Sequence, residues 1–436
     1  MNILLRSATI IDKGSPFHLQ QKDILISEGI IKDIGDKLKA DKDTKIIEEK
    51  NQFVSCGWID MYANLCDPGF EQKETIESGL RAAAAGGFTG VCIIPTTNPV
   101  IQSKGQIEYL KKKAEGNLVN IFPLGAVTQK CEGKELAELY DMHNAGAIAF
   151  SDGENTIGHA DLMMRALQYT VRNNSVIYSH ADEETISHGG QMNEGMISAS
   201  LGMKGIPAMA EELIVVRDLY LAEYTNSRIH FPCISTKHSV ELIREAKKNG
   251  VKVTCGVNPI NLFFDDSAMK DFDSNLKLNP PLRTQEDIAA LKIGFKDRTI
   301  DVICSAHQPQ NIELKDVEYE YAAFGMINLQ TAFSLAVSSL GEVRWDTDLG
   351  LVEELAEKLS ANPKKILNVG DNTNIGVGSN ANLTVFSTEE NFIFTKENNR
   401  SISSNSSLFN MKLKGKVIAT INNNQIFVLK ESLREK

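Results

Sequence analysis

Short apolar segments alternate with helix-like stretches through the middle of the chain. Between Trp58 and His307 there are eight apolar runs of strand length, separated by helix-like and polar stretches. The runs are GWIDMYANL, FTGVCIIP, NIFPLGAV, AIAFSD, SVIYSH, RIHFPCIS, VKVTCGV and TIDVICSAH. Strands that alternate with helices are typical of a parallel sheet. Eight such units predict an α/β fold with a closed (β/α)8 barrel of the TIM type, whose chemistry should lie at the carboxyl ends of the strands.

The two ends of the chain have a different pattern. Short alternating segments, such as ILLRSATII near the start and KVIATI near the end, are separated by Gly, Asn and Asp turns. We therefore expect residues 1–55 and 371–436 to form one small, β-sandwich-like accessory domain, and residues 56–370 to form the barrel. The polar segment 398–407, NNRSISSNSS, is predicted to be a surface loop.

Composition narrows the class of protein. Of the 436 residues 42% are hydrophobic, as in a globular protein, and the formal net charge of -11 argues against nucleic acid or an anionic membrane as a partner. No segment reaches the roughly 18 apolar residues that span a bilayer, and the opening segment is typical of a strand and not of a signal peptide. The seven cysteines form no CxxC pair, so we expect reduced thiols and a cytoplasmic location.

Several long blocks of sequence resemble one known family. The first expected barrel strand ends in Tyr-Ala-Asn-Leu-Cys-Asp-Pro-Gly, and matching blocks follow at 73–91, 145–152, 192–212, 235–247 and 275–291. Over about residues 50–340 the chain resembles the dihydroorotases, which belong to the cyclic amidohydrolases. The resemblance implies a barrel enzyme of pyrimidine biosynthesis that interconverts N-carbamoyl-aspartate and dihydroorotate. It also implies one or two zinc ions, which would activate water at the strand ends.

The resemblance implies that most metal-binding positions have changed. The family's His-x-His pair falls on Tyr62 and Asn64, which are not usual zinc ligands. The family's final Asp, which binds metal and transfers the proton, falls on Ala306, and a methyl group can do neither. Alternation along the strand directs the neighbouring His307 away from that face, so we expect it in the core.

Three positions retain side chains that could bind a metal. Asp152 and His180 match the family's carboxylate and one of its histidines, and Cys233 lies where the family has another histidine. One interpretation is a residual site for a single zinc; the other is that these residues are hydrogen-bonded polar groups in a pocket without metal. A nucleophilic Cys233 paired with His180 is a third interpretation.

The positions that bind the substrate carboxylate in the family have changed as well. They correspond to Cys66, Thr96 and Gln310, where the family has Arg, Asn and His. Loss of the Arg removes the strongest contact to a carboxylate. Asn275 remains, and we expect it to contact a ligand in the substrate pocket.

These changes indicate a dihydroorotase homologue that is catalytically degenerate, holds no cofactor, and has a structural or regulatory role. Inactive members of the family assemble with aspartate transcarbamoylase, so the resemblance implies that enzyme or another pyrimidine-pathway enzyme as a partner, besides a homodimer. Two alternatives stay open. The chain is an active dihydroorotase, or it is another cyclic amidohydrolase that uses a single zinc or no metal.

Overall fold

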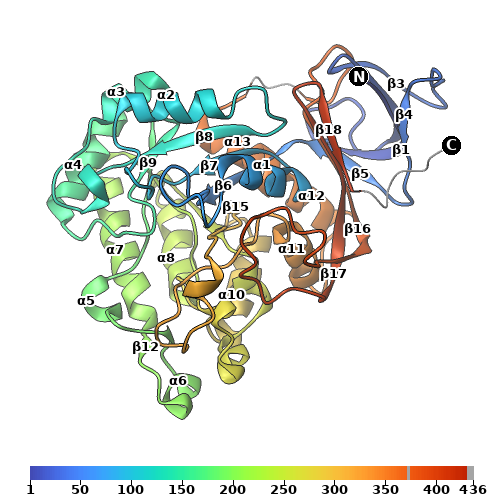
Figure 1. Ribbon diagram of the computed structural model, residues 1–436. Coiled ribbons are helices and arrows are strands. Elements are labelled where there is room, and N and C mark those ends of the chain that lie inside the picture. The colour runs from blue at the N-terminus through green and yellow to red at the C-terminus, as the bar shows by residue number, and fades with distance from the viewer. Residues whose placement is uncertain (371–373, 430–436) are drawn as a thin grey trace.

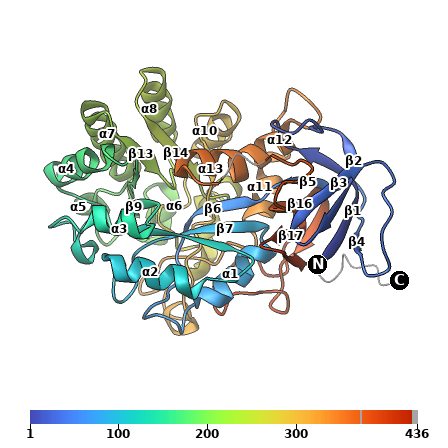
Figure 2. The ribbon, with the colours of Figure 1, turned by 90° about the horizontal axis from the view of Figure 1, so that it is seen from above.

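Eight parallel strands form the barrel in the computed structural model, which describes residues 1–370 and 374–429. They follow one another around the sheet in chain order, and a bridge between Ala63 and His307 joins its first and last edges. This confirms the (β/α)8 architecture (Figures 1 and 2). The strands are β6 (Trp58–Ala63), β7 (Phe88–Ile93), β8 (Asn120–Gly125), β9 (Ala149–Ser151), β10 (Val176–Tyr178), β13 (Arg228–Phe231), β14 (Val253–Val257) and β15 (Val302–Ile303).

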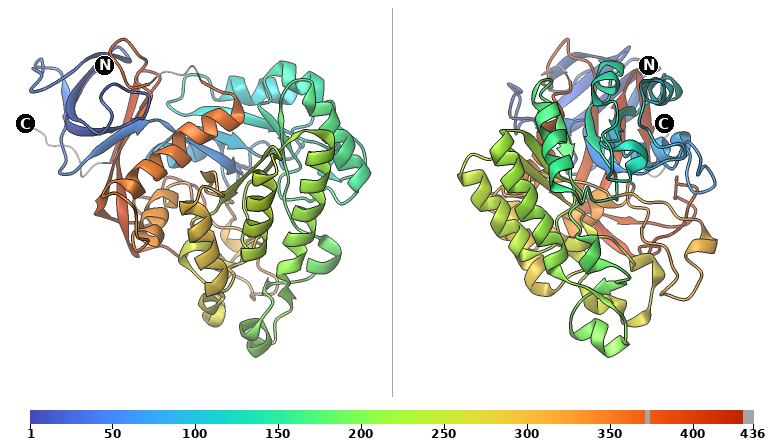
Figure 3. Two further views of the ribbon diagram at one scale, coloured as in Figure 1. Left: turned by 180° about the vertical axis from the view of Figure 1, so that it is seen from behind. Right: turned by 90° about the vertical axis from the view of Figure 1, so that its left-hand side faces the viewer.

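Helices follow each barrel strand and cover the outside of the barrel (Figure 3). They are α1 (Ile76–Ala85), α2 (Lys104–Lys113), α3 (Leu139–Ala145), α4 (Ala160–Val171), α7 (Ala208–Thr225), α8 (Lys237–Lys248), α10 (Gln285–Lys296) and α11 (Ala332–Leu340). Threonine side chains cap several of their first turns; Thr75, for example, accepts a hydrogen bond from the Ser78 amide. Within the two described stretches of chain, no helix is long and apolar enough to cross a membrane.

Shorter elements lie in the connections. After β10 come α5 (Glu184–Ser187), β11 (Met192–Asn193), α6 (Met196–Leu201) and β12 (Gly205–Ile206); α9 (Ile260–Phe263) follows β14; and α12 (Gly350–Ala356) and α13 (Asn362–Leu367) follow α11. A π-type turn (Glu357–Ala361) joins α12 to α13, and 3₁₀ turns cover Gln129–Cys131, Asp266–Asp271, Ser274–Leu276 and Ile312–Leu314.

Strands from both ends of the chain form a second, eight-stranded sheet beside the barrel, as expected of the accessory domain (Figure 1). Its order is β18-β17-β16-β5-β1-β2-β3, with β4 beside β1. The strands are β1 (Asn2–Ile11), β2 (Gln21–Ser27), β3 (Ile30–Gly35), β4 (Lys45–Ile47), β5 (Phe53–Cys56), β16 (Leu383–Ile393), β17 (Lys412–Asn422) and β18 (Gln425–Val428). The expected limits of the two domains stay a prediction, and residues 371–373 and 430–436 lie outside the described residues.

An aromatic cluster joins the sheet to the barrel. Trp58 begins β6, and its ring centroid lies 4.8 Å from Phe333 of α11 and 5.1 Å from Phe386 of β16. The indole N–H donates to the Ser55 hydroxyl at 2.9 Å. Because these rings are fully buried, removing any one of them should cost about 3–5 kcal/mol. The accessory sheet therefore shares a core with the barrel.

Candidate functional site

The carboxyl ends of the barrel strands surround a small cavity. Its volume is about 20 Å³, so it has room for one or two water molecules. The lining residues come from the ends of β6, β7, β9, β14 and β15 and from the loops beyond them: Tyr62, Ile94, Glu154, Asn258, Leu278, Asn279, Pro280, Ala306, His307, Gln308 and Gly325. Side chains and loops therefore fill most of the barrel mouth.

Tyr62 and Asn64 lie at the end of β6, and neither presents a metal-binding group. The Tyr62 hydroxyl is buried and has no hydrogen-bond partner among the described residues. Burial, with further repulsion from the half-buried Glu154 and nearby thiols, raises the pKa of this phenol well above its usual value, so it stays neutral. The Asn64 side-chain oxygen accepts a hydrogen bond from the Cys66 amide at 2.8 Å. A strong oxygen ligand is therefore lacking at both positions.

Asp152 is held by the loop that follows β8. Its carboxylate accepts hydrogen bonds from the amides of Val127 and Thr128 at 2.9 and 2.8 Å, and from the Thr128 hydroxyl. Burial raises the pKa of Asp152 to about 6, although these hydrogen bonds oppose the shift. Anchoring this loop uses both carboxylate oxygens.

His180 and Cys233 contact different side chains. The Asn279 side-chain amide donates to His180 Nε2 at 3.3 Å, and burial lowers the pKa of His180, so the ring is neutral near pH 7. Cys233 Sγ lies 3.0 Å from Cys304 Sγ, just after β15. These contacts support the interpretation of hydrogen-bonded polar residues over that of shared metal ligands.

No group of three or more His, Cys, Asp or Glu side chains is placed to hold a metal ion in residues 1–370 and 374–429. A catalytic zinc normally has three protein ligands. At the position of the family's final Asp, Ala306 offers a methyl group. The residues present therefore do not fit the zinc centre that the resemblance implies.

The altered substrate positions do not form a carboxylate clamp. Cys66 is buried, and burial raises the pKa of its thiol to about 12. The Thr96 hydroxyl and Gln310 Oε1 are buried without a hydrogen-bond partner among the described residues, while Gln310 Nε2 donates to the Phe324 carbonyl at 2.9 Å. These three positions supply no cation.

Asn275 lies away from the cavity, contrary to our expectation. Its side-chain amide donates to Asp273 at 3.0 Å within the turn Ser274–Leu276. Asn279, four positions later in the same block, lines the cavity instead. Two asparagines so close together cannot be told apart by pattern alone, because the turn between them decides which one faces the mouth.

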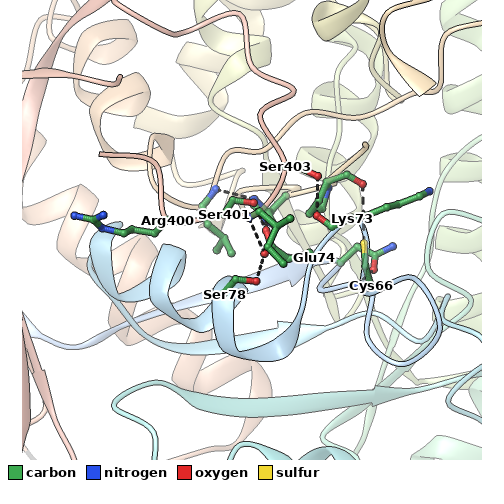
Figure 4. A network of polar contacts seen from close by, with 12 residues as sticks. Cys66, Lys73, Glu74, Ser78, Arg400, Ser401 and Ser403 are labelled. Atoms are coloured by element: carbon green, nitrogen blue, oxygen red, sulfur yellow. Dashed lines mark hydrogen bonds and ion pairs between the residues drawn. The ribbon is translucent and has the colours of Figure 1, made fainter. Parts of the chain in front are cut away.

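A buried carboxylate missed by the sequence analysis lies beside the mouth. Glu74 accepts hydrogen bonds from the hydroxyls of Ser78 and Ser401 (Figure 4). It also accepts one from the Ile402 amide, and its Oε2 lies 3.4 Å from His307 Nε2. His307 is buried, as expected, but it lines the cavity together with Ala306, which the alternation along the strand did not predict. Because Glu74 precedes α1 in a charged stretch, it has the pattern of an ordinary surface residue, and nothing local signals its burial.

The segment 398–407 also closes over the mouth. Asn405 donates to the carbonyls of Gln308 and Gly325, both at 3.0 Å, and accepts from the Gln310 amide at 3.1 Å. The prediction of a surface loop is wrong for Ser403, Asn405 and Ser406, which are buried. Short polar side chains suit this role because they can satisfy the backbone groups of a neighbouring loop.

Solved structures share the fold of this chain. L-Hydantoinase (dihydropyrimidinase) from Arthrobacter aurescens superposes with a TM-score of 0.84 at 22% identity and covers 98% of this chain and 97% of that chain. A D-hydantoinase gives 0.81 at 20% identity, covering 100% of this chain and 96% of that one. The fold is that of an amidohydrolase barrel with an accessory sheet.

Sequence relatives identify the family. A dihydro-orotase-like family model matches residues 51–239. A dihydroorotase of Syntrophus aciditrophicus is 40% identical over 423 residues, 97% of this chain and 98% of that protein. A dihydroorotase of Geotalea daltonii is 41% identical over 374 residues, 86% of this chain and 87% of that protein. The chain therefore belongs to the dihydroorotase family.

Proposed function

We propose that this member of the dihydroorotase family has lost the metal-dependent reaction and serves as a structural or regulatory subunit. The observation that carries the proposal is the set of side chains at the mouth. Tyr62, Asn64 and Ala306 offer no ligand for zinc, Asp152 is engaged by backbone amides, and Cys233 faces another thiol. Without a bound metal, no water at this site would reach the pKa near 7 that hydrolysis requires.

The size of the cavity supports the same proposal. A space of about 20 Å³ is far below the several hundred Å³ of a typical small-molecule site. Gln308, Gln310 and Gly325 are held in place by Asn405, so three separate segments close the mouth together. A dihydroorotate molecule would have to displace them.

An exposed apolar row on α7 supports a role in assembly. The outward face of this helix carries five apolar side chains that are 45–71% exposed: Met209, Leu213, Val216, Tyr220 and Tyr224. Apolar surface of this kind marks protein contacts. The spacing is nearly symmetric about Val216, so an antiparallel α7 from a second copy of the chain would match it across a two-fold axis. We assign the row to a homodimer contact.

Metal content and turnover test the loss of the reaction. Protein purified without chelator should contain far less than one zinc per chain and should not interconvert N-carbamoyl-aspartate and dihydroorotate, with or without added zinc. Near-stoichiometric zinc together with turnover would overturn the proposal. Aspartate transcarbamoylase is the first partner to test, by gel filtration of the two proteins mixed, and failure to co-elute with it or another pathway enzyme would argue against a scaffold role.

A working enzyme is the second candidate. It is favoured by the 40% identity to a named dihydroorotase along nearly the whole chain. One form would use a single zinc held by Asp152, His180 and Cys233, on dihydroorotate or on another cyclic amide. Equimolar zinc that disappears in Cys233→Ala, while Cys131→Ala keeps it, would support this form.

A further inference from the structure

Two thiols from distant parts of the chain meet at the barrel mouth. Cys233 follows β13 and Cys304 follows β15, 71 positions later, and their sulfur atoms lie 3.0 Å apart. A disulfide bond is about 2.0 Å long, so closing the pair requires a movement of about 1 Å. Both residues are reduced thiols in this structure.

The two thiols differ in access to solvent. Cys233 is half-buried, whereas Cys304 is fully buried among the apolar side chains of the barrel, where its Sγ donates to the Pro232 carbonyl at 2.7 Å. Burial raises the pKa of the Cys304 thiol well above its usual value, so this thiol is protonated at rest. An oxidant from solvent would therefore reach Cys233 first.

We propose that Cys233 and Cys304 form a reversible redox pair, in which Cys233 reacts with a hydroperoxide and Cys304 resolves the product as a disulfide. The Cys233 thiolate attacks one oxygen of hydrogen peroxide, the O–O bond breaks, and hydroxide leaves, which gives a sulfenic acid. The Cys304 sulfur then attacks the Cys233 sulfur, the S–O bond breaks, and the leaving hydroxide takes the thiol proton as water. In sum, two thiols lose two electrons and two protons, and one peroxide becomes two waters.

The disulfide would change the mouth of the barrel. It would link the loop after β13 to the end of β15 across the intervening β14. Cys304 is followed by Ser305, which donates hydrogen bonds to Asp60. The next residues, Ala306 and His307, line the cavity. Oxidation would therefore fix this edge of the mouth, and a thiol reductant would release it by attacking the more exposed Cys233 sulfur. The inference does not require the chain to be an enzyme or to lack activity, but it excludes the single-zinc form in which Cys233 binds the metal.

Thiol counting and peptide mapping on the full-length protein test the proposal. The reduced chain has seven thiols; after a small excess of hydrogen peroxide it should lose two, with a mass decrease of about 2 Da and one linked peptide pair containing Cys233 and Cys304. Dithiothreitol should restore all seven. Seven thiols remaining after peroxide, or a linked pair that involves other cysteines, would overturn the proposal.

Variants assign the order of the steps. Cys304→Ala should accumulate a sulfenic acid on Cys233 that dimedone labels, Cys233→Ser should form no disulfide, and Cys131→Ser, at the same end of the barrel, should behave as the parent protein. If a variant in the core fails to fold, peptide mapping of the unsubstituted protein still shows whether Cys233 and Cys304 become linked. Stoichiometric zinc on Cys233 that protects it from peroxide would also overturn the proposal.

Discussion

Glu74 and His307 meet inside the protein, where Glu74 Oε2 lies 3.4 Å from His307 Nε2 and neither side chain reaches solvent. The amides of Asn328 and Leu329 donate to His307 Nδ1 at 3.0 and 3.3 Å, so Nε2 carries the ring hydrogen that faces the carboxylate. Burial alone would raise the pKa of Glu74, but hydrogen bonds from His307, Ser401 and Ser78 lower it overall. This contact joins the start of α1, the end of β15 and the segment 398–407.

Substituting Glu74 should destabilise the fold. Glu74→Gln leaves His307 and Ser401 without their charged acceptor, so we expect a loss of about 2–4 kcal/mol in the free energy of unfolding near pH 7. Glu77→Gln is the matched control, because Glu77 lies in the first turn of α1, three residues after Glu74, and forms an exposed pair with Arg81. This substitution should cost less than about 0.5 kcal/mol. Denaturant unfolding measures both, and equal effects would contradict a special role for Glu74.

The contribution of Glu74 should also depend on pH. A carboxylate with a lowered pKa in the folded state adds stability that is present above its unfolded pKa, about 4.3, and is lost as the pH falls through the folded value. The stability gap between the parent protein and Glu74→Gln should therefore be constant near neutral pH and shrink below about pH 4. A gap that stays unchanged down to pH 3 would contradict the ionised state of Glu74.

The ionisation of Asp60 should change the stability with pH in the opposite sense to that of Glu74. Asp60 is fully buried in β6, where it accepts hydrogen bonds from the Ser305 amide and hydroxyl at 2.6 and 2.9 Å, and burial raises its pKa to about 7. Because the pKa of Asp60 is raised in the folded state, its contribution to stability is greatest below the pKa of the unfolded chain. That contribution is lost as the pH rises to about 7, by up to about 1.4 kcal/mol per pH unit. Asp60→Asn should flatten the stability profile between pH 4 and 7, and an unchanged profile would refute this.

Restoring the family's ligands should restore metal binding. In the combined variant Tyr62→His, Asn64→His, Cys233→His and Ala306→Asp, the donors that the resemblance implies would join Asp152 and His180 at the mouth. Zinc content by elemental analysis should rise from far below one to about one per chain, while turnover should stay absent because Cys66 supplies no cation for the substrate. A folded variant without zinc would show that the mouth no longer has the geometry of a metal centre.

The exposed row on α7 should control the oligomeric state. Tyr220→Glu places a charge within this row, next to its centre at Val216. It should shift a dimer toward monomer by at least about tenfold in dissociation constant, measured by analytical ultracentrifugation. Tyr140→Glu on α3 is the control, because Tyr140 is similarly exposed but lies on another helix. A dimer that is equally stable in both variants would place the contact elsewhere.

The barrel follows from local patterns in the chain. Each of the eight apolar runs became a strand, because a parallel strand is buried on both faces and must be apolar along its length. The ends of the chain form the accessory sheet for a similar local reason, since alternation and turn residues define its strands. The positions at the mouth were also predictable, because β6 and β15 place Tyr62 and Ala306 at the same end of the barrel.

Contacts between distant segments were decided only by the tertiary structure. The pairing of Cys233 with Cys304, the closure of the mouth by Asn405, and the burial of Glu74 against His307 each join residues that local sequence patterns treat independently. The same is true of Asn279, which lies at the cavity in place of Asn275. Hydrophobic periodicity determines which face of an element is buried, but the partner of a buried polar group depends on which loops meet after the barrel has closed.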